Sequence, residues 1–307
     1  MILARPMVTA ALALWLWAAP VRAADVPYVP TPWNVVDAML KLAAVGPNDF
    51  LIDLGSGDGR IVTTAAKRIG TRGFGVDLDD NLVRSARRYA ETEGVKDRVA
   101  FYTRNLFDTD ISKATVISMY LLNSVNLRLR PSLFKLKPGT RIVSHDFDMA
   151  KWTPDERLTI SVPEKSYGPP SSEVFLWIVP ADASGRWRWQ LAAGEANVEY
   201  DASFEQTFQM IAGAVQGGGR SAPVSDARMR GESITFTLTT ERDGRAVRQV
   251  YSGRLVGDTI EGRVTIDGMQ SPWRATRSAR GEMIINVLND AVAHEKWAAL
   301  FLTKEQQ

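Results

Sequence analysis

Three alternating glycines follow an acidic residue in the stretch from Phe50 to Arg60, which reads FLIDLGSGDGR. The apolar residues 50–52 predict a short buried strand that ends at Asp53. The glycines come next, at Gly55, Gly57 and Gly59. Glycine lets a ligand approach the backbone closely, and the helix predicted from Ile61 points free N–H groups at the same place. The stretch therefore predicts a nucleotide-type binding loop between a strand and a helix.

A second acidic residue stands where a ribose-binding residue is expected. The strand predicted at Gly73–Val76 ends at Asp77, 24 residues after Asp53. An acid at about this spacing accepts hydrogen bonds from ribose hydroxyls in βαβ nucleotide sites. The glycine spacing does not fit the dinucleotide fingerprint G-x-G-x-x-G. It resembles D-x-G-x-G-x-G, the S-adenosyl-L-methionine (SAM) loop of class I methyltransferases. A tight strand–helix turn without a ligand is the alternative interpretation.

Polar residues also follow the later predicted strands. These strands are expected at 99–103, 114–122 and 141–147. Ligands of open α/β sheets bind beyond the carboxyl ends of the strands. The sequence therefore predicts one rim of polar side chains made by Asp53, Asp77, Asn105, Tyr120, His145 and Asp146.

An extended segment and a helix precede the glycine loop. Prolines stiffen the stretch from Asp25 to Pro32, and apolar residues at helical spacing follow in 33–45. We expect Tyr28 and Thr31 to fold over the mouth of the cofactor site. The alternative for Tyr28 is an aromatic residue that only packs.

Residues 27–180 resemble the seven-strand protein-lysine methyltransferases, in the branch of the non-SET histone-lysine and ATP-synthase c-subunit enzymes. Four segments carry this resemblance: Pro27–Thr31, Asp53–Ile61, Tyr120–Leu122 and Ser144–Phe147. It implies a Rossmann-like, doubly wound α/β fold with a mostly parallel seven-stranded sheet of order 3-2-1-4-5-7-6. Strands expected at 158–162 and 174–179 would complete that sheet. It also implies SAM as cofactor and a protein acceptor, first a lysine amine, with a small-molecule acceptor left open.

The resemblance assigns roles to individual residues. Cofactor binding falls to Thr31, Asp53, Gly55, Ser56, Gly57, Asp77, Asn105 and Leu106. Asp77 is expected at the ribose hydroxyls, and Asn105 with the Leu106 backbone at the adenine, although such enzymes usually carry Asp in place of Asn105. Asp53 is expected to orient the loop or to meet the amino end of the cofactor. The candidates for the methyl-transfer channel are Tyr28, Tyr120 and Asn123, and the alternative for Asn123 is a helix cap.

The residue types present exclude several other chemistries. The chain has no Cys and only two His, at 145 and 294, so a thiolate nucleophile is excluded and a His-rich metal centre is not expected. No Asn/Asp-Pro-Pro-Tyr string follows the fourth strand, as it does in DNA amino-methylating enzymes. His145 beside Asp146 fits either a general base for an oxygen nucleophile or a histidine that packs at a strand end.

The first residues have the composition of a signal peptide. Arg5 precedes an uncharged apolar run at 8–19, and Val21–Ala23 fits a signal-peptidase site. Residues 1–23 are therefore expected to direct the chain to the periplasm or outside the cell, with an uncleaved membrane anchor or a misassigned start as alternatives. Without them the chain has 35 basic and 35 acidic residues, so no nucleic-acid partner is expected.

The pattern of apolar and polar residues changes after residue 183. Short alternating runs separated by Gly and Asp turns predict an antiparallel sandwich or barrel domain at 184–280. Residues 281–307 show apolar residues at helical spacing and predict a closing amphipathic helix that contains His294. A non-catalytic SAM-fold protein in the periplasm, whose β domain holds a partner, is the alternative to an enzyme.

Overall fold

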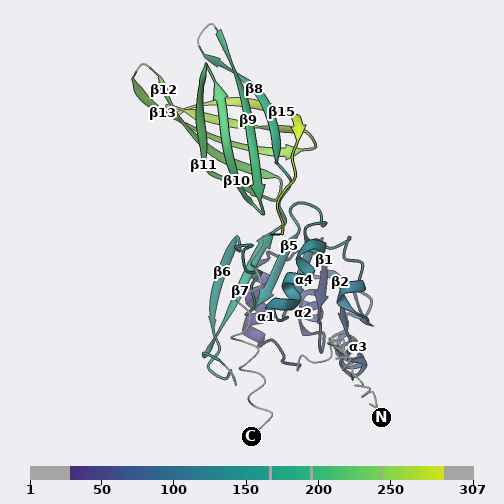
Figure 1. Cartoon of the computed structure of the whole chain (residues 1–307). Helices are drawn as coiled ribbons and strands as arrows, with labels where there is room; N and C mark the ends of the chain where they lie inside the picture. The colour runs from purple at the N-terminus through teal and green to yellow at the C-terminus, as the bar shows by residue number, and fades with distance from the viewer. Residues whose placement is uncertain (1–27, 166–167, 194–195, 243, 287–307) are drawn as a thin grey trace, which may run out of the picture.

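The computed structural model describes residues 28–165, 168–193, 196–242 and 244–286. Figure 1 shows a sheet covered by helices, drawn in purple to teal, and a barrel of strands drawn in green to yellow beyond one end of that sheet. Within the described ranges, no helix combines the length and apolar character needed to cross a membrane.

The first unit is a seven-stranded sheet of order β3-β2-β1-β4-β5-β7-β6. The first five strands in this order run parallel, and β7 is antiparallel to both β5 and β6. The strands are β1 (Phe50–Leu54), β2 (Arg72–Asp77), β3 (Val99–Thr103), β4 (Val116–Met119), β5 (Arg141–His145), β6 (Glu156–Ser161) and β7 (Ser171–Ile178). The predicted sheet, including its strand order, is confirmed.

Helices cover both faces of this sheet. They are α1 (Trp33–Leu42), α2 (Arg60–Ile69), α3 (Asp80–Thr92) and α4 (Asn123–Leu133), with a short 3-10 helix, η2, at Leu106–Asp108. Apolar residues of α1, α2 and α3 form one buried cluster with the sheet, and those of α4 join a second cluster. A sheet buried on both faces needs strands that are apolar throughout, and β4 is buried at each of its four positions.

The second unit is a closed barrel of antiparallel strands in the order β10-β11-β12-β13-β14-β15-β8-β9. Its strands are β8 (Gly185–Ala193), β9 (Ala196–Thr207), β10 (Met210–Gly217), β11 (Arg220–Arg230), β12 (Ser233–Arg242), β13 (Arg245–Val256), β14 (Thr259–Ile266) and β15 (Met269–Arg280). Large rings fill the interior, where Phe236 and Tyr251 stack with centroids 4.4 Å apart. Of the two architectures that the sequence left open, the barrel is the one adopted.

Two local features interrupt the alternation of the barrel strands. The chain turns at Phe208, which adopts a φ of 53°, so that residues 204–214 are divided between β9 and β10. The alternation of β11 is interrupted within the strand. The register shifts between Ser225 and Arg228, and Asp226 between them has a φ of 51°. Such a bulge places two residues of one strand opposite a single residue of its partner, so the alternation of apolar and polar residues does not continue through it.

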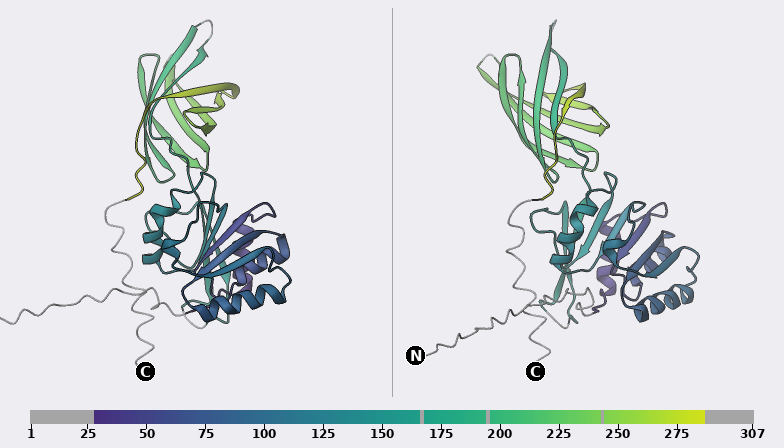
Figure 2. Two further views of the ribbon diagram at one scale, coloured as in Figure 1. Left: turned by 90° about the vertical axis from the view of Figure 1, so that its right-hand side faces the viewer. Right: turned by 45° about the vertical axis from the view of Figure 1, so that its right-hand side comes forward.

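The barrel docks on the end of the sheet where the parallel strands begin (Figures 1 and 2). Phe208 enters the core of the first unit, where its ring lies 6.2 Å from that of Trp152. Ala181, after β7, donates a backbone hydrogen bond of 2.8 Å to Gly231 O of the barrel. The Arg228 guanidinium pairs at 2.5 Å with the buried carboxylate of Asp155. The two units therefore share buried contacts.

Residues 281–286 do not begin a helix. Ile284 pairs instead with Thr207 as an isolated parallel bridge, and its N–H donates 2.8 Å to Gln206 O. Ile285 packs against the core of the first unit while Ile284 is exposed, which is the alternation of an extended segment. The expected start of the closing helix is thus wrong, and the remainder of that prediction, with His294, lies outside the described residues.

Candidate functional site

A cavity of ≈ 580 Å³ opens beyond the carboxyl ends of β1, β2 and β4. The residues predicted at the site that line it are Tyr28, Thr31, Asp53, Gly55, Ser56, Gly57, Asp77, Leu106 and Tyr120. Its place agrees with the rule that α/β sheets bind ligands outside these strand ends. The cavity lies at the opposite end of the sheet from the barrel.

The glycine loop leaves no room for side chains along one wall of the cavity. Gly55 and Gly57 have φ angles of 79° and 53°, which L-residues with a side chain rarely adopt. A Cβ at Gly57 would lie 2.4 Å from the ring of Tyr28, and one at Gly55 would lie 2.7 Å from the side chain of Leu121. The loop therefore presents bare backbone to whatever occupies the cavity.

The charged residues that line the cavity are four aspartates and two arginines: Asp53, Asp58, Asp77, Asp79, Arg60 and Arg104. Asp77 accepts a hydrogen bond of 2.9 Å from the N–H of Gly57, and this bond fixes the side chain at the end of β2. Asp53 is buried and accepts 2.7 Å from the hydroxyl of Ser118. Burial raises the pKa of Asp53 to about 7, with the charges of Asp77 and Asp58 adding to the rise and the Ser118 bond opposing it.

This lining fits SAM. The hydroxyls of a ribose can donate hydrogen bonds to a carboxylate such as Asp77, and the cationic sulfonium and amino groups suit a cavity lined by more aspartates than arginines. Ser56 lines the cavity, and its Oγ is buried without a hydrogen-bond partner within the described ranges. Residues 55–57 provide the bare backbone for close approach.

A short segment at residues 28–32, called the strap below, covers the glycine loop. Arg60 ties it down, because its Nη1 donates 2.7 Å to the carbonyl of Thr31. The same guanidinium binds Asp58 at 2.6 Å and lies 4.9 Å from the ring of Trp33. Tyr28 lies against Gly57, and partial burial beside Asp58 raises its pKa to about 12. The phenol therefore stays protonated at neutral pH.

Arg60 was missed by sequence reasoning, although a signal was present. It is the first residue of α2, where the helix macrodipole disfavours a cation. A cation at that position indicates a local partner, and Asp58 is that partner. Ser118 was also missed, and its signal is a lone hydroxyl within the apolar residues of β4.

Two predicted residues are not among those that line the cavity. Asn105 uses its side-chain oxygen to accept 3.0 Å from the N–H of Phe107 at the start of η2, so the adenine role predicted for it is not supported. Asn123 donates 2.8 Å to Asp148 Oδ1 and so holds the segment after β5. It makes no cap hydrogen bond for α4 either, so neither interpretation of Asn123 describes its contacts.

His145 lies behind the cavity wall. Its ring is fully buried, and its nitrogens share hydrogen bonds with Thr31 Oγ1 at 3.3 Å and Ser172 Oγ at 2.9 Å. Burial lowers the pKa of His145 to about 4, and the carboxylate of Asp146, 3.4 Å from Nε2, opposes this shift. The contacts favour a packed, neutral histidine over a general base that faces the cavity.

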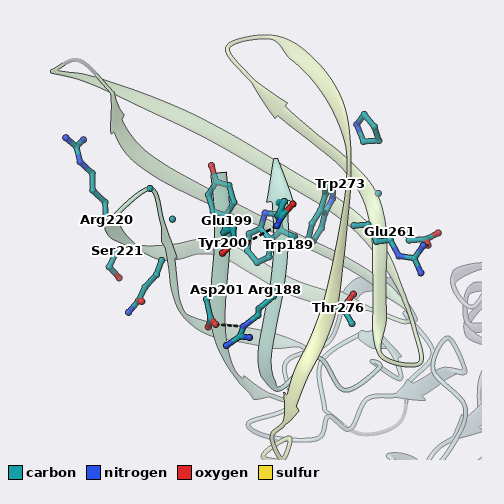
Figure 3. Close-up of a pocket in the computed structure, with 18 residues that line it drawn as sticks. Arg188, Trp189, Glu199, Tyr200, Asp201, Arg220, Ser221, Glu261, Trp273 and Thr276 are labelled. Carbon is teal, nitrogen blue, oxygen red and sulfur yellow. Dashed lines mark hydrogen bonds and ion pairs between the residues drawn. The ribbon is translucent and has the colours of Figure 1, made fainter. Parts of the chain in front are cut away.

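A larger cavity of ≈ 1530 Å³ lies in the barrel wall (Figure 3). It lies beside a seam at which β8 and β15 pair only from Gly185 to Trp189, and the β8–β9 and β14–β15 hairpins diverge beyond it. Its three acids already have partners, because Asp201 pairs with Arg188 at 2.9 Å, Glu261 pairs with Arg274 at 3.3 Å, and Glu199 accepts 2.9 Å from the Gln190 amide. The glycine loop and carboxylates that fit SAM belong to the smaller cavity instead.

The sheet order and the glycine loop with Asp77 define a SAM-dependent methyltransferase of class I. The model of the ANTKMT methyltransferase domain matches residues 53–156. The protein-lysine N-methyltransferase of Saccharolobus islandicus is 47% identical over 137 residues, which make up 44% of this chain and 85% of that protein. The chain belongs to the protein-lysine N-methyltransferase family.

Two further proteins show how far the likeness extends. The human lysine N-methyltransferase of the ATP synthase c-subunit is 31% identical over 153 residues, which make up 50% of this chain and 61% of the relative. A crystal structure of an RNA methyltransferase from Salinibacter ruber, in complex with S-adenosyl-L-homocysteine, shares 50% identity. That match covers 50% of this chain and 95% of the other, with a TM-score of 0.46.

Proposed function

We propose that this protein transfers a methyl group from SAM to a lysine amine of a protein. The observation that carries the proposal is the cavity in which the bare backbone of Gly55–Gly57 meets the carboxylates of Asp53 and Asp77 under the strap. The names of two of the relatives, which are lysine methyltransferases, support lysine as the acceptor.

SAM supplies a methyl group that its sulfonium already activates. The chain therefore has to bind SAM, orient the acceptor toward the methyl group and exclude water. In this proposal Asp77 accepts hydrogen bonds from the ribose hydroxyls, and Asp53 faces the cationic part of SAM. Leu106 also lines the cavity, and the proposal assigns its backbone to the adenine. The rings of Tyr28 and Tyr120 line the cavity from the strap and from the end of β4, where they can flank the acceptor amine.

The cofactor site is tested by titrating SAM calorimetrically into the protein and its Asp77→Ala variant. We expect at least about tenfold weaker binding by the variant, equivalent to about 1.4 kcal/mol. Asp110→Ala serves as a control, because that carboxylate is bonded to Ser112 away from the cavity. Equal affinities of wild type and Asp77→Ala would contradict the assignment of Asp77.

The acceptor class is tested with radiolabelled SAM and a protein extract of the host organism. Half of the extract is first acetylated at its lysine amines, which converts them to amides that cannot accept a methyl group. We expect label in a protein band of the untreated extract, its loss from the blocked extract, and methyl-lysine in the band by mass spectrometry. Label that enters only small molecules, or that persists after blocking, would contradict a lysine acceptor.

We also propose that the protein works outside the cytosol or at a membrane, on the basis of the apolar run at 8–19 and the Val21–Ala23 motif. A reporter that is active only after export, fused behind residue 40, tests this. The matched control replaces two apolar residues of the run by Arg. Equal reporter activity of the two fusions would contradict export.

A further inference from the structure

The strap has a cavity on each side. Val29 and Pro30 line the cofactor cavity, and they also line a second cavity of ≈ 560 Å³ on the side of His145 and Trp33. A segment between two cavities has few packing contacts to fix its position. Hydrogen bonds at Thr31 must therefore contribute much of what fixes the position of the strap.

Thr31 is held from two directions. Its carbonyl accepts the hydrogen bond from Arg60, on the side of the glycine loop. Its hydroxyl is buried and shares the 3.3 Å hydrogen bond with His145 Nδ1, at the end of β5. Thr31 thus joins the strap both to Arg60, directly after the glycine loop, and to the central sheet, while Tyr28 makes a further hydrogen bond to Asp58 of the loop.

The imidazole of His145 is itself fixed by its other neighbours. Its Nε2 shares a hydrogen bond of 2.9 Å with Ser172 Oγ, and that hydroxyl also accepts 3.1 Å from the Lys165 ammonium. Lys165 in turn donates 2.6 Å to Asp146. One face of the imidazole stacks on Tyr120, with ring centroids 3.9 Å apart. Because the ring is held both at its edge and on its face, its Nδ1 has a fixed direction, toward the hydroxyl of Thr31.

We propose that His145 is a positioning residue, which holds the strap over the cofactor through Thr31. It acts through its neighbours, since it touches the cavity wall from behind and is not among the residues that line the cofactor cavity. The inference rests on the proposed function, because the strap covers the site assigned to SAM. It gives His145 a role that differs from both a general base and an inert packing residue.

Double-mutant coupling between His145 and Thr31 tests the proposal. His145→Phe keeps a flat ring against Tyr120 but removes both ring nitrogens, and Thr31→Val removes only the hydroxyl. We expect each variant to weaken SAM binding at least about fivefold, and the double variant to be no more than about twofold weaker than either. The proposal would be overturned if the loss of SAM affinity in the double variant equalled the product of the two single losses, or if both single variants kept the wild-type affinity.

Two controls separate positioning from a general loss of stability. Thr71→Val makes the same change at a buried threonine that bonds Gly46 O at 3.0 Å, remote from the strap, and should leave SAM affinity unchanged. Thr31→Ser keeps a hydroxyl and should recover much of the SAM affinity that Thr31→Val loses. A loss of affinity in Thr71→Val equal to that in Thr31→Val would overturn the proposal.

Amide hydrogen exchange provides a measurement that does not depend on SAM. The N–H groups of Val35 and Val36 bond to Pro32 O directly after the strap. They should exchange faster in Thr31→Val and His145→Phe than in wild type or Thr71→Val. Unchanged exchange would overturn the proposal even if wild type bound no SAM, whereas that lack of binding would count against the proposed function.

Discussion

At the scale of single residues, burial gives Asp53 a property that its position in the sequence does not reveal. Its carboxylate lies in the cavity, has one hydroxyl partner in Ser118, and has a pKa raised to about 7. Near neutral pH the free protein therefore contains both protonation states of Asp53. The cationic groups of SAM favour the ionised state, so binding and proton release are linked.

SAM affinity should consequently rise with pH. Below pH 7 binding must first remove the proton from Asp53, so we expect up to about tenfold weaker binding at pH 6 than at pH 8. Calorimetry in buffers of different ionisation enthalpy measures both the affinity and the proton released. Asp53→Asn cannot ionise and should show neither effect. A flat profile in the wild type would contradict the role given to Asp53.

Gly57 tests the need for bare backbone in the loop. Gly57→Ala places a methyl group at a φ of 53° and against the ring of Tyr28, so we expect at least about tenfold weaker SAM binding. Gly94→Ala is the matched control, because Gly94 has a φ of 70° and open space around its Cβ position. Its strain should cost about 1 kcal/mol of stability without changing SAM affinity. Equal losses in the two variants would contradict a steric role.

At the scale of elements, the turn between β9 and β10 joins the two units. Phe208 is buried, stacks on Phe134 at 5.8 Å, and lies 5.1 Å from the guanidinium carbon of Arg130. The side chain thus belongs to the core of the unit that binds the cofactor, although its backbone belongs to the barrel. Contacts of this kind couple the unfolding of two units.

Phe208→Ala should therefore destabilise the whole protein. Removing a buried aromatic ring leaves a cavity, and we expect a loss of about 3–5 kcal/mol in the free energy of unfolding. Chemical denaturation followed by fluorescence and circular dichroism measures this loss. Met210→Ala, two residues further on and exposed, should change stability by less than about 0.5 kcal/mol. Similar small changes in both variants would show that the turn does not couple the units.

At the scale of the whole molecule, the barrel and the cofactor cavity lie at opposite ends of the sheet. The barrel contacts Gly139, before β5, whereas the cavity lies beyond the other end of the parallel strands. Residues of the barrel cavity are therefore too remote to touch bound SAM. Any contribution of the barrel to methylation has to act through a partner or through stability.

Changes in the barrel cavity should leave SAM binding intact. Arg188 and Arg274 are exposed and paired with acids on neighbouring strands, so their replacement by Ala costs little stability. We expect the double variant to bind SAM within about twofold of the wild type by calorimetry. A change above about fivefold would contradict the separation of the two sites.

Local patterns were sufficient to predict much of the first unit. Glycine spacing, an acid at the end of each of two strands, and apolar runs bounded by turns are all features of neighbouring residues. They indicated the loop at 53–59 and Asp77 directly, and the family resemblance supplied the strand order. The strap was also expected, because prolines restrict their own neighbours.

Only the tertiary structure decided which distant side chains meet. Thr31 bonds His145 across 114 residues, and Asp53 bonds Ser118 across 65, and no period in the sequence records such pairs. The barrel closes because β8 pairs with β15, and a pairing between distant strands has no local signature. Asn105 and Asn123 were predicted to contact a ligand, but a short amide side chain can equally bond to nearby protein groups. In the structure Asn105 bonds to the backbone of Phe107, and Asn123 bonds to the carboxylate of Asp148. The sequence therefore determined the loop and its chemistry, while long-range packing determined what surrounds them.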